Sequence, residues 1–140
     1  MADGSNVRIN GDLFATGTIS VPSDARFKTA LEPLTGALEK LDSVQAVSFE
    51  RNALGQSLGQ PGDRRELGVL AQELEAVFPE LVTATGPEAY RAVDYSRLTV
   101  VLLEALKELK AEHAALQAAH EALQARVKEL EAQRAEEAGR

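Results

Sequence analysis

The chain has 140 residues, a net charge of -7 and a sequence pI near 4.9, a size that suits one small domain with an appendage. Its acidic balance argues against nonspecific binding to nucleic acid and against anionic membranes, because both need a basic surface. The absence of cysteine excludes disulfides and thiolate metal sites, and an aromatic content of 4% argues against a large aromatic-lined pocket.

The first 22 residues predict a β-rich, stem-like segment. From Val7 to Val21 every odd position is apolar or small, and the even positions are polar except for Phe14, which is the period of a half-buried strand. A piece this short is not stable alone, so it needs the following domain or copies of itself. The sequence has no secretory signal pattern, which would be a basic start followed by an apolar run, and no stretch of 18 apolar residues that could span a membrane. We therefore expect a soluble protein made in the cytoplasm.

Residues 23–96 predict a small α+β domain. Leucines at spacings of three and four predict a short helix over 31–42, and alternation predicts a strand over 44–50. The glycine-rich stretch 51–66 is typical of a long mobile hairpin loop. Residues 67–82 predict a buried strand running into a helix that Pro79 ends, and 82–95 predict a hairpin turning at Gly86 and Pro87.

Residues 97–140 predict a long helix that forms a coiled coil, and the heptad pattern alone does not decide between a dimer and a trimer. The helical pattern starts after Asp94, a plausible N-cap, and continues to about Glu137 without an interrupting glycine or proline. About 42 residues would reach roughly 60 Å, so the helix needs partner helices. The predicted seam consists of d and a positions seven residues apart: Leu102, Leu106, Leu109, His113, Leu116, His120, Leu123, Val127 and Leu130.

Three segments resemble the intramolecular chaperone and auto-processing domain at the C-termini of phage tailspikes, tail fibres and endosialidases, which is related to a domain of myelin regulatory factor. They are "SDARFK" (23–28), "LGVLAQELEAVFPELV" (67–82) and "AVDYSRLTVVLLEALKELK" (92–110). The resemblance implies a homotrimer whose long helices form a parallel trimeric coiled coil. This homotrimer would help a β-rich fibre stem to trimerise and then cut itself off. The resemblance would place the protein in a phage virion or a phage-tail-like particle. It also implies a catalytic dyad, which maps onto Ser23 and Lys28.

The chemistry of this dyad is simple in principle. A serine hydroxyl is a poor nucleophile unless a base removes its proton, and lysine serves as that base only in its neutral form. A spacing of five does not put two side chains on one helix face, so we expect Ser23 in an extended turn and Lys28 near the start of the next element. Spacing alone would make Ser23 or Asp24 a mere cap, and the two downstream motifs favour the dyad.

The position of the cut is open on the residues alone. The resemblance favours the bond between Ser23 and Asp24. Attack by Ser23 on its own carbonyl would close a strained four-membered ring, whereas attack on the Pro22 carbonyl closes a five-membered ring and attack on a neighbouring chain avoids both. Asp24 and Arg26 are candidates for orienting this loop, with solvation at the surface as the alternative.

The two histidines both fall at a positions of the seam. In a trimer each would form a ring of three imidazoles able to bind a transition metal or an anion. Polar a positions that fix register and oligomer state are the favoured explanation, and we assign no metal site and no cofactor. The predicted function is a trimeric chaperone that cleaves itself once. Its main rival is a trimeric adaptor that keeps the fold and never cuts.

Overall fold

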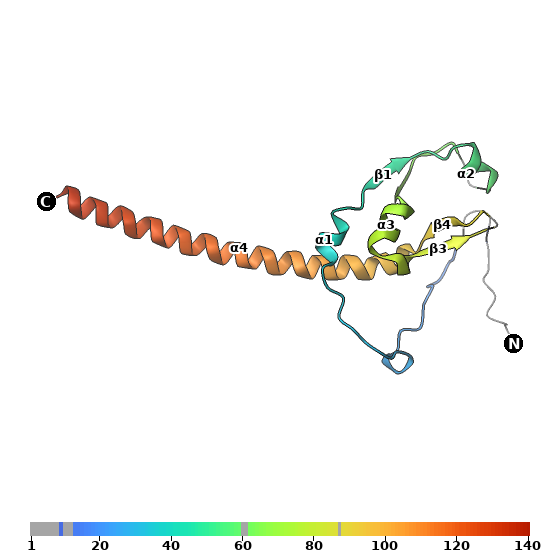
Figure 1. The fold of residues 1–140 in the computed structure, drawn as a ribbon, viewed down its shortest axis with the longest axis horizontal. Helices are drawn as coiled ribbons and strands as arrows, with labels where there is room; N and C mark the ends of the chain where they lie inside the picture. The colour runs from blue at the N-terminus through green and yellow to red at the C-terminus, as the bar shows by residue number, and fades with distance from the viewer. Residues whose placement is uncertain (1–8, 10–12, 60–61, 87) are drawn as a thin grey trace. The chain divides into compact units, whose positions relative to one another are not determined.

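The computed structural model describes residues 9, 13–59, 62–86 and 88–140, and the chain divides into two units (Figure 1). One unit contains residues up to Pro33 and residues 45–70. The other contains 34–44 and 71–140. The α+β class and the long C-terminal helix predicted from the sequence are confirmed.

The first unit holds a short helical turn and a β-hairpin. The turn is the 3-10 helix η1 (Ala25–Phe27), and the hairpin pairs β1 (Ala46–Phe49) with β2 (Glu66–Val69) antiparallel. The strand predicted over 44–50 is therefore confirmed. The second strand is not buried, contrary to the prediction, because Leu67 is 85% exposed in the single chain.

One prediction for this unit is wrong, and another holds only in part. Residues 9 and 13–22 form no strand, because a strand needs a neighbouring strand for its backbone hydrogen bonds and the single chain provides none here. The rest of the predicted strand lies outside the described residues. The predicted hairpin loop 51–66 does join the antiparallel strands β1 and β2, but it is not irregular throughout, because it contains a helix, α2 (Ala53–Ser57). The Asn52 side chain caps α2 by accepting a hydrogen bond from the Gly55 amide at 3.0 Å, so an N-cap signal outweighs the glycine content of this segment.

The second unit carries the buried core. It consists of α1 (Ala37–Leu41), α3 (Ala71–Val77), the 3-10 helix η2 (Pro79–Leu81), the antiparallel hairpin of β3 (Val82–Thr85) and β4 (Tyr90–Val93), and α4 (Tyr95–Ala138). Helix α1 and the η2 turn contact α4, and α3 packs against η2 and the β3–β4 hairpin (Figure 1). The buried side chains, which come from four of these elements or their ends, are Ala37, Leu74, Phe78, Leu81, Val101 and Ala105.

Helix α1 is shorter than the predicted helix over 31–42, and residues 31–36 are not helical. Pro33 disfavours helical backbone in the residue before it, and Gly36 takes a left-handed conformation with φ of 67°. The helix in 67–82, its end before Pro79 and the hairpin after it are confirmed, with Gly86 at the turn in a left-handed conformation (φ 71°) and Pro87 outside the described residues.

Helix α4 begins where the sequence predicts it and is tied to the core at its start. The Asp94 side chain accepts from the Arg97 amide at 3.0 Å, and the Asp94 amide donates to the Leu81 carbonyl at 2.9 Å. Its 44 residues reach about 66 Å at 1.5 Å per residue. Only Val101 and Ala105 of α4 are buried, so the helix beyond Leu109 is exposed on every side in the single chain.

Candidate functional site

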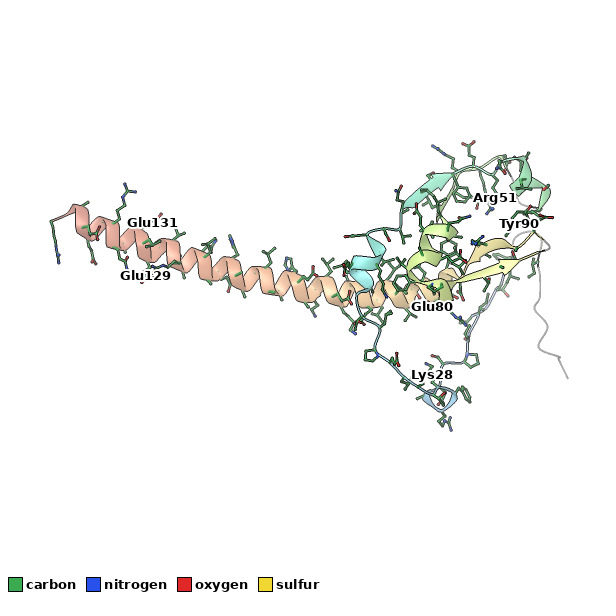
Figure 2. All side chains as sticks on the ribbon, viewed as in Figure 1. Lys28, Arg51, Glu80, Tyr90, Glu129 and Glu131 are labelled. Carbon is green, nitrogen blue, oxygen red and sulfur yellow. The ribbon has the colours of Figure 1, made fainter. Side chains whose placement is uncertain are left out.

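The candidate dyad is brought together by the η1 turn. Lys28 Nζ donates a hydrogen bond to Ser23 Oγ at 2.8 Å, and Figure 2 labels Lys28 at this turn. A 3-10 helix has three residues per turn. The single turn over residues 25–27 therefore brings Lys28 back to the side of the chain where Ser23 lies. Ser23 lies outside regular secondary structure, next to the extended residue Asp24, and Lys28 stands at the end of η1 and not at its start.

The turn itself is held by Asp24. Its Oδ1 accepts from the Arg26 backbone amide at 2.9 Å, and the backbone closes through the Lys28 amide, which donates to the Ala25 carbonyl at 3.0 Å. Asp24, and not Ser23, is therefore the N-cap. Because capping falls to its neighbour, the Ser23 hydroxyl remains for Lys28.

Asp24 and Arg26 form a salt bridge next to the dyad in the sequence. The guanidinium of Arg26 donates to both carboxylate oxygens, at 3.0 Å from Nε and 2.7 Å from Nη2. This hydrogen bonding, followed by that of the Arg26 amide, holds the pKa of Asp24 below its usual range. The carboxylate thus stays ionised and engaged by Arg26, which leaves Lys28 as the group on the serine hydroxyl.

Ser23 and Lys28 are both exposed in the single chain. A solvated lysine is predominantly an ammonium at neutral pH, and an ammonium donates to a hydroxyl instead of accepting its proton. The geometry therefore supplies proximity and orientation.

The predicted seam residues lie along one exposed stripe of α4. The leucines at d positions are about half exposed or more. Helix α1 and the η2 turn pack on another stripe of α4, formed by Val101, Ala105 and Glu108. At about 100° per residue the two stripes are separated by roughly a quarter turn or more. The structure thus leaves the predicted seam uncovered in the single chain.

Glu108 is a residue that the sequence analysis missed. Its carboxylate accepts the first two amides of α1, from Ala37 at 3.2 Å and from Leu38 at 2.8 Å. These backbone hydrogen bonds, the Leu38 amide first, lower the pKa of Glu108. The two partners are about 70 positions apart in the sequence, so no local pattern predicts this contact. The N-cap residue of α1 is Gly36, which has no side chain to cap the helix, and Glu108 takes that role.

The part of the chain that the structure describes holds neither a membrane-spanning helix nor a cluster of metal ligands. Among residues 9, 13–59, 62–86 and 88–140, no helix is long and apolar enough to cross a bilayer, and no three His, Cys, Asp or Glu side chains come together as metal ligands.

Comparison with known proteins gives one family and several relatives. Residues 23–83 match the family described as chaperone of endosialidase. The chain is 32% identical over 116 residues to the long tail fiber protein Gp37 of Enterobacteria phage K3. The matched stretch covers 77% of this chain and 9% of that protein. The same protein of phage T2 matches at 32% over 116 residues, with 77% and 8% covered.

A more distant relative comes from an animal. Myelin regulatory factor homolog 1 of Caenorhabditis elegans is 28% identical over 111 residues, covering 76% of this chain and 12% of that protein. The chain therefore spans only about a tenth of the length of these three relatives.

Proposed function

Because the chain belongs, through residues 23–83, to the family of endosialidase chaperones, we propose that it is a homotrimeric intramolecular chaperone that aligns a β-rich fibre stem and then cuts itself next to Ser23. The observation that carries the catalytic half is the 2.8 Å contact between Lys28 Nζ and Ser23 Oγ. A nucleophile and its base must lie within about 2.6–3.2 Å, which this pair does before any assembly.

The chaperone half depends on bringing three chains into register. Pairing three chains on one β stem is slow, because distant segments must meet before any contact is gained. A coiled coil of α4 would raise the local concentration of the stems and fix their register. The exposed seam, which includes Leu102, Leu106 and Leu109, supports this role, because burying such a stripe requires partner helices.

The proposed reaction is one turnover of acyl transfer. In neutral form, Lys28 takes the proton of the Ser23 hydroxyl while Oγ attacks the carbonyl carbon of the Ser23–Asp24 bond in a neighbouring chain. Lys28 then delivers the proton to the departing Asp24 nitrogen, and an ester remains. Water hydrolyses the ester, which restores the Ser23 hydroxyl and frees the cut chain with a C-terminal carboxylate. Attack between chains avoids the four-membered ring that Ser23 would form with its own carbonyl.

The rival function is a trimeric adaptor that never cuts, and the exposure of Lys28 is the observation that favours it. A denaturing gel of the purified chain separates the two. We expect the wild type to convert to a shorter species, while Ser23→Ala and Lys28→Ala stay whole. A wild-type chain that sediments as a trimer and remains whole after prolonged incubation would leave only the adaptor.

A further inference from the structure

The two histidines of the chain occupy equivalent places on α4. His113 and His120 are seven residues apart in an uninterrupted helix, on the stripe that carries Leu109, Leu116 and Leu123. Seven residues rise about 10.5 Å, so in a parallel, in-register coil the two histidines form separate layers. Each layer would lie between two layers of leucine, which keep water from entering along the axis.

Each histidine is followed four residues later by a glutamine, Gln117 and Gln124. For the second pair the structure shows the contact: the Gln124 amide nitrogen lies 2.9 Å from Nε2 of His120. Positions four apart are neighbours on a helix surface. With the amide turned over, its carbonyl oxygen accepts from Nε2–H of His120, and the lone pair of Nδ1 is then left for a metal ion. Such an outer partner is what orients a metal-ligating histidine.

The charge around the layers suits a cation. Between Lys110 and Arg126 the helix carries two glutamates, Glu112 and Glu121, and no lysine or arginine. Three neutral imidazoles enclosed by leucine would otherwise keep polar ring nitrogens without partners, which is costly in a dry core. An anion would need protonated rings and would meet the glutamates, so the surroundings favour a metal ion.

Resting on the trimeric coil of the proposed function, we propose that His113 and His120 form two stacked three-imidazole layers that bind divalent transition-metal ions on the trimer axis. Three imidazole nitrogens at about 2.0–2.1 Å with water in the fourth place match the coordination preferred by Zn²⁺. The site exists only in the assembly, because one chain supplies a single ligand to each layer. Bound metal would therefore stabilise the trimer against dissociation.

The test uses the full chain without a polyhistidine tag, treated with chelator and then titrated with Zn²⁺ in a calorimeter. We expect about two ions per trimer, about one in His113→Leu or His120→Leu, and none in the double variant, whose leucines suit the seam. Zn²⁺ should raise the melting temperature of wild type most, that of each single variant less, and that of the double variant not at all. Gln124→Ala should weaken binding by about 10- to 100-fold, whereas Gln133→Ala, outside the layers, should not.

Two results would overturn the inference while leaving the chaperone intact: a trimer that melts identically in Zn²⁺ and in chelator, or undiminished binding in the double variant. Sedimentation of the same samples reports the assembly separately. A monomer throughout would refute the trimeric coil of the proposed function and remove these layers with it.

Discussion

Replacing Lys28 by arginine separates the two roles that a cation beside Ser23 can have. Arginine keeps the positive charge and hydrogen-bond donors, so it can maintain a contact like the 2.8 Å one between Nζ and Oγ. It cannot give up its proton in a protein, so it cannot serve as the base. If the contact only holds the η1 turn, Lys28→Arg should behave as wild type; if Lys28 is the base, cleavage should fail.

The expected size of the effect follows from this single contact. Removing a positioned general base costs about 10²–10⁴ in rate, or roughly 3 to 5 kcal/mol of activation free energy. The assay is the intact fraction on a denaturing gel over time, with Lys110→Arg as a control on exposed α4. Trimer content is measured in parallel. Cleavage of assembled Lys28→Arg within tenfold of wild type would refute the role of Lys28 as base.

The remaining predictions concern the unit that carries the core. Phe78→Ala should destabilise it by about 3–5 kcal/mol in urea denaturation followed by tyrosine fluorescence, because Phe78 is 1% exposed; a loss below 1 kcal/mol would contradict the packing. Glu108→Gln should lower hydrogen-exchange protection of the Ala37 and Leu38 amides, while the exposed Glu112→Gln should not. Because folding lowers the pKa of Glu108, its stabilisation is complete above the ordinary glutamate value of about 4.3 and is lost as the pH falls through the folded-state value. Protection of these two amides in wild type should fall over that range, and unchanged protection would count against the carboxylate contact.

The features that the sequence predicts correctly are those with local causes. The start of α4 follows from an Asp94 side chain that can reach an amide three residues on, and its extent follows from 44 residues free of glycine and proline. The hairpin of β3 and β4 follows from alternation on both sides of Gly86, where the turn needs a positive φ. Each of these signals lies within a few residues of the feature it sets.

The features that were missed have causes elsewhere in the chain. Leucine spacing predicted α1 to begin near residue 31, but the helix begins at Ala37, where a carboxylate from Glu108 caps it. The strand predicted before residue 22 has the right alternation but finds no second backbone in a single chain. For the candidate site, the residue pair was predicted from a resemblance, and the η1 turn supplies the reason why a spacing of five can work.

Intact mass spectrometry of the incubated wild-type trimer tests the central claim most directly. Cleavage between Ser23 and Asp24 should release a C-terminal product that begins at Asp24 and contains the last 117 of the 140 residues, with Ser23→Ala giving none. A product that begins at Ser23 would show that the Pro22 carbonyl is attacked instead. A wild-type trimer that retains the mass of the whole chain would contradict self-cleavage.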